Sequence, residues 1–399
     1  MNRSTVALVR CDSYDADQVY AALTRGVELL GGLDRFVRSG ERILLKPNIL
    51  AGEAPEKAVT THPAVLAGCA ELFRRGGATV CFGDSPGLES PGHAAEKSGL
   101  RKAGAQSGAD FVEFAPGKPL VNPHGKMATE FPVAQVIHEC DGIVNLPKMK
   151  THQLTRVTGA VKNLFGCIPG KRKALYHVQH QNVTDFCTLL TELNQGLRTR
   201  LHVMDGIVAM EGNGPRSGDP TPMRVLVLSD DPVAVDATFC RLVAMDPEFL
   251  PTTILGSRAG LGRYKDSEIE LVGDPLEMLA NPGFRMVRKP VYSNATYAHY
   301  PAIRNLVLPR PYIDATKCVK CGLCVNSCPV PDKALRFENG RRDRPPVYDY
   351  ERCIRCFCCH EMCPHRAIHT HTPLLGRALH LGQAQAEPFA GAPSAAHGN

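Results

Sequence analysis

The chain has 399 residues, of which 43% are hydrophobic and 22% are charged, the composition of an ordinary globular protein that can bury a substantial core. It lacks a run of about 18 uncharged apolar residues, so we expect no transmembrane segment and no membrane partner. The formal net charge of +6 is small for this length and argues against nucleic acid as a partner, which usually demands a concentrated basic face.

The distribution of the cysteines indicates a reducing compartment. Nine of the 16 cysteines lie between Cys318 and Cys363. This crowding at three-residue spacing is typical of metal or cluster ligation rather than of a disulfide framework. The apolar stretch from Val6 to Val9 is too short for the core of a secretory signal. We therefore expect a cytoplasmic protein.

Residues 1–280 alternate β-branched runs with amphipathic stretches, which predicts an α/β domain with a mostly parallel sheet and helices on its faces. The expected strands are 5–9, 42–45, 78–82, 111–114, 141–146, 201–204, 223–228 and 269–272. The apolar spacing predicts helices at 16–31, 63–75, 183–197 and 232–244.

Several of these strands end in Gly, Pro, Asn or Asp. The loops are Lys46-Pro47-Asn48, Gly83-Asp84-Ser85-Pro86-Gly87, Pro147-Lys148 and Asp205-Gly206. In open α/β sheets, loops at the carboxyl ends of the strands form the ligand crevice, so these loops could converge on one site. Each loop taken alone is better explained as a turn or a helix cap, because the same residue types dominate turns.

The segment from Asn145 to His180 contains the densest group of polar side chains. Lys148, Lys150 and Lys162 accompany Asn163 among Gly and Pro residues, which favours a pocket for an anion such as a carboxylate or phosphate. A solvent-exposed basic loop is the alternative. The apolar residues interspersed in the segment argue against plain exposure: Leu146, Val161, Leu164 and Phe165.

Two further side chains in this segment have possible chemical roles. His152 could act as a general acid, although a lone histidine is more often structural. Cys167 is better explained as a buried apolar thiol than as a nucleophile.

A second polar loop runs from Met210 to Gly218 and contains Gly212, Gly214 and Gly218. Its backbone amides could approach a ligand closely, or the loop could be a flexible connector. It matches neither G-x-G-x-x-G nor a phosphate-binding P-loop, and no such nucleotide motif occurs elsewhere in the chain.

Residues 281–310 are rich in Pro, Tyr and basic side chains without clear periodicity, and we expect a linker there. Beyond it, a domain at 311–372 contains the cysteine runs. The tail, residues 373–399, turns to Ala, Gly, Pro and Gln, and this composition predicts that it is largely disordered.

Two cysteine runs of the form C-x2-C-x2-C-x3-C-P begin at Cys318 and Cys353. This spacing is that of bacterial 4Fe-4S ferredoxins, in which the fourth cysteine of each run ligates the other cluster. It predicts two 4Fe-4S clusters. Cluster one would take Cys318, Cys321, Cys324 and Cys363, and cluster two would take Cys353, Cys356, Cys359 and Cys328.

A zinc site fits this pattern less well, because structural zinc is usually held by paired C-x2-C units. Cys358 has no counterpart in the first run, and we expect a packed thiol that is not a ligand. Strands at 334–337 and 346–348, joined through Asn339-Gly340, complete a small α+β unit that resembles the two-cluster bacterial ferredoxin fold.

Residues 5–270 resemble the domain-of-unknown-function 362 family. In many relatives such a domain is followed by a two-cluster ferredoxin region. The resemblance implies an iron–sulfur protein and names no reaction. It rests on six motifs in order: Leu45-Lys46-Pro47-Asn48; Gly83-Asp84-Ser85-Pro86-Gly87; Asn145-Leu146-Pro147-Lys148; the stretch Thr158 to Gly170; Asp205-Gly206 with Glu211-Gly212-Asn213-Gly214-Pro215; and Asp231-Pro232-Val233-Ala234-Val235-Asp236.

Together these features predict an iron–sulfur oxidoreductase that passes electrons from two 4Fe-4S clusters to an anionic substrate or cofactor in the α/β domain. Lys148, Lys150 and Lys162 would anchor the anion, Asn163 would orient it, and His152 would supply a proton.

The alternative is a non-enzymatic electron-transfer subunit or adaptor that docks a partner reductase. Its docking patch would be Lys171-Arg172-Lys173. In both cases we expect an electron donor or acceptor protein as partner. Nucleic acid is disfavoured, because the basic segment lacks sustained aromatic interleaving.

Overall fold

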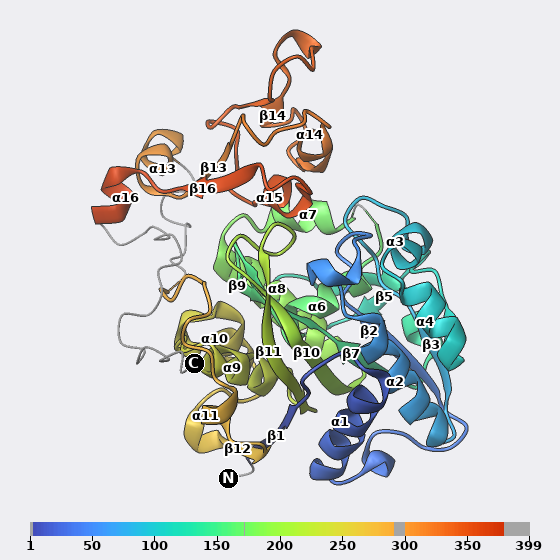
Figure 1. Cartoon of the computed structure of the whole chain (residues 1–399). Helices are drawn as coiled ribbons and strands as arrows, with labels where there is room; N and C mark the ends of the chain where they lie inside the picture. The colour runs from blue at the N-terminus through green and yellow to red at the C-terminus, as the bar shows by residue number, and fades with distance from the viewer. Residues whose placement is uncertain (1–2, 171, 291–299, 379–399) are drawn as a thin grey trace, which may run out of the picture.

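A large twisted sheet forms the centre of the α/β part in the computed structural model, which describes residues 3–170, 172–290 and 300–378 (Figure 1). Ten strands of the described residues belong to this sheet, in the order β12-β1-β11-β10-β7-β2-β3-β4, with β8 paired to β10 and to β9. The strands are β1 (Ser4–Arg10), β2 (Arg42–Pro47), β3 (Thr79–Phe82), β4 (Asp110–Phe111), β7 (Gly142–Leu146), β8 (Lys148–His152), β9 (Arg156–Thr158), β10 (Thr199–Glu211), β11 (Asp219–Ser229) and β12 (Ile269–Gly273).

Parallel pairing dominates the sheet. It joins β10 to β7, β7 to β2, β2 to β3, β3 to β4, and β1 to β12. Antiparallel pairing is found where β11 lies between β1 and β10 and where β9 returns along β8. The predicted α/β class with a mostly parallel sheet is confirmed, and each of the eight expected strands overlaps an observed strand.

Helices cover both faces of the sheet because the side chains of each strand alternate between two cores. In β1, Ala7 and Val9 belong to the core shared with α1 (Ala16–Leu29) and α2 (Pro63–Arg75), whereas Val6 and Leu8 belong to the core shared with α9 (Pro232–Leu242). On that second side, α8 (Val183–Gly196) packs with α10 (Pro251–Arg258), and α10 also packs with α9. The four predicted helices correspond to α1, α2, α8 and α9.

Local sequence explains where these helices begin. The Asp231 carboxylate accepts hydrogen bonds from the backbone of Val233 and Ala234, and Pro232 occupies the first helical position of α9. The His62 side chain likewise accepts from the backbone of Ala64, ahead of Pro63 at the start of α2.

Other elements have no strong periodic signal in the sequence. The hairpin of β5 (Gly117–Val121) and β6 (Glu130–Ala134) pairs as a separate two-stranded sheet. β5 is mostly exposed, so its sequence lacks the apolar alternation of a core strand. The remaining helices of this part are short: α3 (Pro91–Lys97), α4 (Leu100–Ser107), α5 (Val136–Glu139), α6 (Ala160–Asn163), α7 (Arg172–Gln179) and α11 (Leu276–Leu279).

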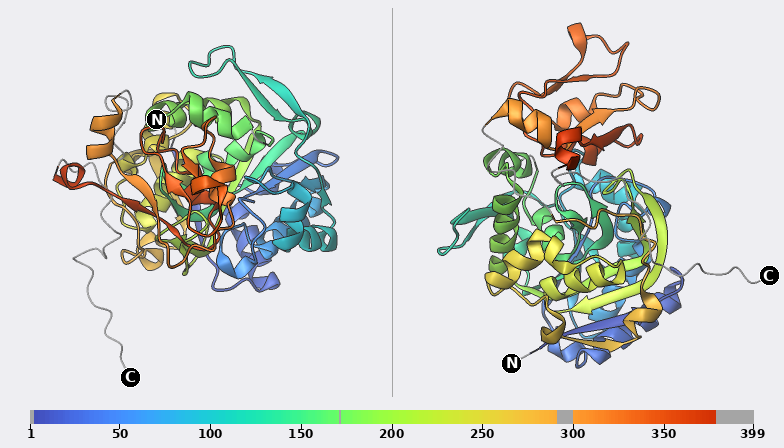
Figure 2. Two further views of the ribbon diagram at one scale, coloured as in Figure 1. Left: turned by 90° about the horizontal axis from the view of Figure 1, so that it is seen from above. Right: turned by 90° about the vertical axis from the view of Figure 1, so that its left-hand side faces the viewer.

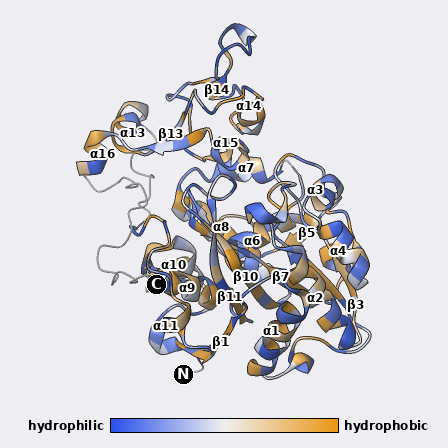
Figure 3. Cartoon of the chain, in the orientation of Figure 1, coloured by the Kyte–Doolittle hydropathy of each residue, from blue (hydrophilic) through white to orange (hydrophobic). Residues whose placement is uncertain are grey.

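The cysteine-rich part lies at the end of the sheet near α7 and the tip of the β10–β11 hairpin (Figures 1 and 2). Its elements are α14 (Leu323–Ser327), α15 (Cys358–Met362), and the antiparallel pairs of β13 (Arg310–Ile313) with β16 (Ile368–His371) and of β14 (Leu335–Arg336) with β15 (Val347–Tyr348). The loop beyond β14 is hydrophilic in Figure 3 and contains Arg341, Arg342 and Arg344.

Two short helices flank the small sheets. α13 (Pro301–Val307) packs against α16 (Leu374–Ala378). α13 falls inside the predicted linker, of which residues 291–299 lie outside the described residues. The predicted tail, residues 373–399, begins with α16 in the structure, and the rest of the predicted disorder falls on residues 379–399, which also lie outside the described residues. Within the described residues, no helix combines the length and apolar character needed to cross a bilayer.

Candidate functional site

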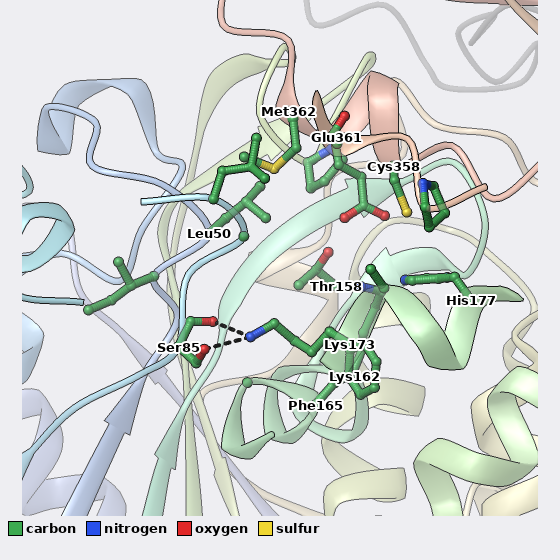
Figure 4. A pocket seen from close by; sticks show the side chains of 18 of the residues that line it. Leu50, Ser85, Thr158, Lys162, Phe165, Lys173, His177, Cys358, Glu361 and Met362 are labelled. Carbon is green, nitrogen blue, oxygen red and sulfur yellow. Dashed lines mark hydrogen bonds between the residues drawn. The ribbon is translucent and has the colours of Figure 1, made fainter. Parts of the chain in front are cut away.

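A cavity of about 380 Å³ opens where the carboxyl ends of the sheet strands meet the cysteine-rich part. Its walls come from both parts of the chain: Lys46 ends β2 and Asp84 follows β3, whereas Cys328 and Glu361 belong to the cysteine-rich part. Figure 4 shows side chains from both parts around this space. Because ligands of open α/β sheets bind at the carboxyl ends of the strands, this cavity is the candidate functional site.

The charged groups in the wall are mainly cationic. Among the described residues, five lysines and two carboxylates line the cavity: Lys46, Lys150, Lys162, Lys173 and Lys333, with Asp84 and Glu361. Apolar side chains complete the wall, among them Leu50, Phe165 and Met362. The arrangement suits a small anion that has an apolar body.

An ion pair forms the floor next to strands β2 and β3. Lys46 Nζ lies 2.7 Å from Asp84 Oδ1, and both side chains are buried. Asp84 Oδ2 also accepts from the backbone N–H of Ile49 at 2.6 Å. Gly166 is required at this point, because a Cβ atom there would lie 2.1 Å from Asp84 Oδ1. The pair is hydrogen-bonded on both sides, so we assign it a structural role beneath the cavity.

Lys150 is fully buried and has little to balance its charge. Its Nζ donates to the Val59 carbonyl at 2.6 Å. Burial lowers the pKa of Lys150 well below its ordinary value, and the charges of Lys162 and Lys148 lower it further. An anion in the cavity would favour the charged ammonium, so binding would take up a proton at this side chain.

Lys162 and Asn163 are adjacent in α6 and also line the cavity. The Asn163 amide is bound at both ends: Oδ1 accepts from Lys46 Nζ at 3.2 Å, and Nδ2 donates to Asn145 Oδ1 at 2.7 Å. Asn163 therefore orients the neighbouring side chains, whereas Lys162 faces the cavity (Figure 4).

Lys173 forms hydrogen bonds to the loop that follows β3. Its Nζ donates to Ser85 Oγ at 2.7 Å and to the Ser85 carbonyl at 2.9 Å (Figure 4). It also donates to the Ile168 carbonyl at 3.0 Å. Burial lowers the pKa of Lys173 to about 8. Its ammonium is therefore turned into the cavity wall, whereas the predicted docking patch required it on the surface; of that patch, Lys171 lies outside the described residues.

His152 connects the two parts of the chain. Its Nδ1 accepts from the backbone N–H groups of Leu154 and Thr155 at 3.1 and 3.2 Å, which leaves the ring proton on Nε2. Nε2 lies 2.8 Å from Oε1 of Glu361, on α15. Burial lowers the pKa of His152 to about 4, so the ring is neutral near pH 7.

Glu361 and His177 complete this side of the cavity. Burial acts to raise the pKa of Glu361, but His152 and Lys162 hold it below its ordinary value. Burial lowers the pKa of His177 to about 4, and its ring stacks on Phe186 with the centroids 4.4 Å apart. The wall therefore presents a neutral His152 N–H beside a carboxylate.

Lys148 is not among the residues that line the cavity. Its Nζ lies 2.7 Å from Asp205 Oδ2 and 2.7 Å from the Tyr14 hydroxyl. Asp205 Oδ2 accepts from the backbone N–H of His62 at 2.9 Å, and the Tyr14 ring stacks on His62. Of the predicted site residues, the structure thus brings together His152, Lys150, Lys162 and Asn163, and it places Lys148 in a separate network.

Several cavity residues escaped the reasoning from sequence. Lys46 and Asp84 stand in strand-end loops that the sequence already marked, and the convergence of such loops could have identified them. Lys173 was predicted to belong to a docking patch, and His177 and Glu361 gave no local signal; all three reach the cavity through tertiary packing. Cys167 is fully buried and burial raises its pKa to about 12, as an unreactive thiol requires.

The thiols of the cysteine-rich part gather in two places. Cys318, Cys321, Cys324 and Cys363 line one hollow. Cys353 and Cys328 pack together around Ala334, and the Tyr348 hydroxyl lies 3.3 Å from Cys359 Sγ. The first group is the set that the spacing assigned to cluster one, and Cys353 and Cys328 belong to the set assigned to cluster two. The assignment of ligands to two clusters stays a prediction. Cys328 also stands in the wall of the cavity, as does Cys358.

The tip of the β10–β11 hairpin holds the cysteine-rich part. Ser217 Oγ donates to the Cys363 carbonyl at 2.8 Å, and Arg216 Nη1 donates to the Met362 carbonyl at 2.9 Å. Asn213 Oδ1 lies 2.7 Å from His360 Nε2. The Gly-rich loop thus contacts α15 and its flanks, and its Pro215 also lines the cavity.

Comparison with known proteins identifies both parts of the chain. Residues 43–241 match the model for a domain of unknown function, DUF362, and residues 310–364 match the model for a 4Fe-4S dicluster domain. The thylakoid-associated protein sll1697 of Synechocystis sp. is 36% identical over 258 residues, which cover 64% of this chain and 80% of that protein.

A crystal structure of a Thermotoga maritima protein aligns with this chain at 13% identity and a TM-score of 0.34. The alignment covers 63% of this chain and 60% of the Thermotoga maritima chain. The match to the dicluster model indicates iron–sulfur binding in the C-terminal part. The chain belongs to the DUF362 family and has a 4Fe-4S dicluster region at its C-terminal end.

Proposed function

We propose that this protein is an iron–sulfur oxidoreductase in which two 4Fe-4S clusters deliver electrons to a small anionic molecule in the cavity. The α/β domain, residues 1–280, holds the anion, and the domain at 311–372 holds the clusters. The ligand sets are those of the sequence: Cys318, Cys321, Cys324 and Cys363 for cluster one, and Cys353, Cys356, Cys359 and Cys328 for cluster two.

One observation carries the proposal. Cys328, a ligand in the cluster-two set, lines the same cavity as Lys150 and Lys162. A cluster held by this set would border the cavity in which the lysines would hold the anion. When bound, the clusters supply single electrons. The side chains of the cavity wall bind the anion, orient it and donate a proton.

These side chains have distinct roles. Lys150 and Lys162 bind the anionic group through their ammonium charges, and Asn163, hydrogen-bonded to Lys46 and Asn145, orients the side chains of the wall. His152 carries its proton on Nε2, in the cavity wall beside Glu361. From there it can donate the proton to a substrate atom that gains negative charge. Lys333, in the cysteine-rich part, adds a fifth cation to the wall.

The electron donor would be a protein that docks where cluster one is nearest to solvent. Cys321 is exposed, and Arg341, Arg342 and Arg344 lie in the exposed loop beyond β14. These arginines favour an acidic partner. The same surface supports the second candidate function, an electron-transfer adaptor whose acceptor is another protein. For the location we propose a reducing, cytoplasmic compartment, because none of the 16 cysteines forms a disulfide.

The test uses full-length protein with its iron and sulfide restored under anaerobic conditions. After reduction with dithionite and removal of the excess, the protein is mixed with unsaturated carboxylates, oxo acids and nitroaromatic acids, and reoxidation is followed by absorbance. We expect at least one of these anions to reoxidise the clusters. The Lys162→Met variant should lose about tenfold or more in rate, because a charge that binds the anion is removed.

Lys102→Met, which removes an exposed lysine of α4, is the matched control and should behave as the parent protein. Equal rates for Lys162→Met and Lys102→Met would rule out this cavity as the site of reduction. Failure of every anion, together with rapid reoxidation by a co-purifying protein, would establish the adaptor in its place.

A further inference from the structure

The two cysteine runs fold into repeated backbone loops. The backbone N–H of Cys318 donates to the Asp314 carbonyl at 3.1 Å, and that of Cys353 donates to the Asp349 carbonyl at 3.0 Å. Within the loops, Lys320 and Arg355 occupy the same position, and both have a φ of 61°. Differences between the two loops therefore lie in their side chains and surroundings.

The residues at this repeated position have different surroundings. Lys320 is partly exposed. Arg355 is only 3% exposed and lies under α13, where its guanidinium donates to Asn305 and sits 5.1 Å over the ring of Tyr350. Its Nε and Nη1 atoms have no hydrogen-bond partner among the described residues. A buried guanidinium in this state is strongly unfavourable unless a negative charge stands beside it.

The neighbouring group is the cluster-two set of thiols. Arg355 stands between Cys353 and Cys356 in the same loop, so its positive charge lies close to these thiols. A second feature acts in the same direction: the Tyr348 hydroxyl lies 3.3 Å from Cys359 Sγ, close enough to donate to a thiolate. At the repeated position of the first half stands Ile313, which cannot donate a side-chain hydrogen bond.

We propose that Arg355, aided by Tyr348, raises the reduction potential of cluster two above that of cluster one, so that electrons collect next to the cavity. A positive charge and a hydrogen bond to a ligand sulfur both stabilise the more negative, reduced state. One electron leaves cluster one, which is oxidised, and enters cluster two, which is reduced; the anion in the cavity is the final acceptor. The inference rests on the two clusters of the proposed function and adds the direction of electron flow.

The test is a redox titration of anaerobic, full-length holoprotein followed by EPR spectroscopy. Arg355→Met should lower the midpoint potential of one cluster only. We expect about a tenfold change in the ratio of its reduced to oxidised forms at a fixed potential, which is about 59 mV for a one-electron couple. Tyr348→Phe should lower the potential of the same cluster by a smaller amount. Lys320→Met, the matched change in the other loop, should have less than a third of the effect of Arg355→Met.

Equal shifts in Arg355→Met and Lys320→Met, or a shift shared by both clusters, would overturn the inference. If Arg355→Met does not assemble its clusters, Arg355→Lys and Tyr348→Phe decide: Arg355→Lys should keep the parent potential because it keeps the charge, and Tyr348→Phe should still lower it. An unchanged potential in Tyr348→Phe and an altered one in Arg355→Lys would then contradict it. Iron and sulfide analysis that finds fewer than two clusters would refute the proposed function itself, whereas the absence of an anionic substrate would leave the measured potentials valid.

Discussion

Two lysines two residues apart on β8 are both buried, but their surroundings differ. Lys148 has an ion pair with Asp205 and a hydrogen bond with Tyr14, each at 2.7 Å. The hydrogen bond found for Lys150 within the described residues goes to the Val59 carbonyl, and its ammonium borders the cavity. The network of Lys148 is closed, whereas the Lys150 ammonium borders the cavity in which we propose that an anion binds.

Strand register produces this difference. Lys148 lies opposite Asp205 of β10, whereas Lys150 lies opposite Met210, with a shift of register between the two pairs. Lys148 therefore meets a carboxylate and Lys150 meets an apolar side chain. A buried charge with its full set of partners stabilises the fold, whereas one that faces a cavity without a counter-ion is a candidate for ligand binding.

The largest effect should follow from breaking the closed network. Lys148→Met leaves the Asp205 carboxylate buried without its counter-ion, and we expect the free energy of unfolding to fall by about 3–5 kcal/mol. Thermal unfolding followed by circular dichroism measures the loss, with Lys102→Met as the surface control. A loss as small as that of Lys102→Met would mean that the network does not stabilise the fold.

The sequence predicted the framework of the molecule well. Eight strands and four helices have strong apolar periodicity because they border the two cores, and this periodicity was sufficient to place them. The β5–β6 hairpin was missed, since an exposed hairpin has no need of such a pattern. Short elements such as α6 and α13 were missed because packing rather than propensity determines them.

The candidate site was only partly predictable for a related reason. Lys150, Lys162, His152 and Asn163 are near one another in the sequence, so their polar character was visible as a cluster. The separation of Lys148 from Lys150 depends on the register between β8 and β10, which no local pattern reveals. Glu361 reaches His152 from the other part of the chain, and only the docking of α15 on the β10–β11 hairpin brings them together.

A smaller effect concerns the binding of an anion in the cavity beside Lys150 and its dependence on pH. Burial lowers the pKa of Lys173 to about 8 and that of Lys150 below its ordinary value. A bound anion favours both charged forms, so binding takes up protons and affinity falls as pH rises through about 8. For sulfate, which keeps its charge in this range, we expect the dissociation constant to rise by up to about tenfold per pH unit between pH 7 and 9 for each proton taken up.

Calorimetric titration of the anaerobic protein in two buffers of different ionisation enthalpy measures this uptake directly. Lys173→Met should remove part of the slope, and Lys102→Met, an exposed change on α4, should retain it. Sulfate affinity that is independent of pH from 7 to 9 would show that these two ammonium groups do not contact the anion.

The smallest effect on stability should come from Lys150→Met, the counterpart of the first substitution. Because no carboxylate is left unpaired, replacing a buried ammonium with an apolar chain of similar length should change the free energy of unfolding by less than about 1 kcal/mol, in the stabilising direction.

The sign of this change in the free energy of unfolding also depends on pH. The unfolded chain binds more protons at this lysine than the folded chain does, so the parent protein gains stability as pH rises toward the ordinary lysine pKa, and Lys150→Met should lose that part of the gain. Sulfate binding should nevertheless weaken, because the ammonium that borders the cavity is removed. A stability loss comparable to that of Lys148→Met would place Lys150 in the structural network and would erase the distinction between the two lysines.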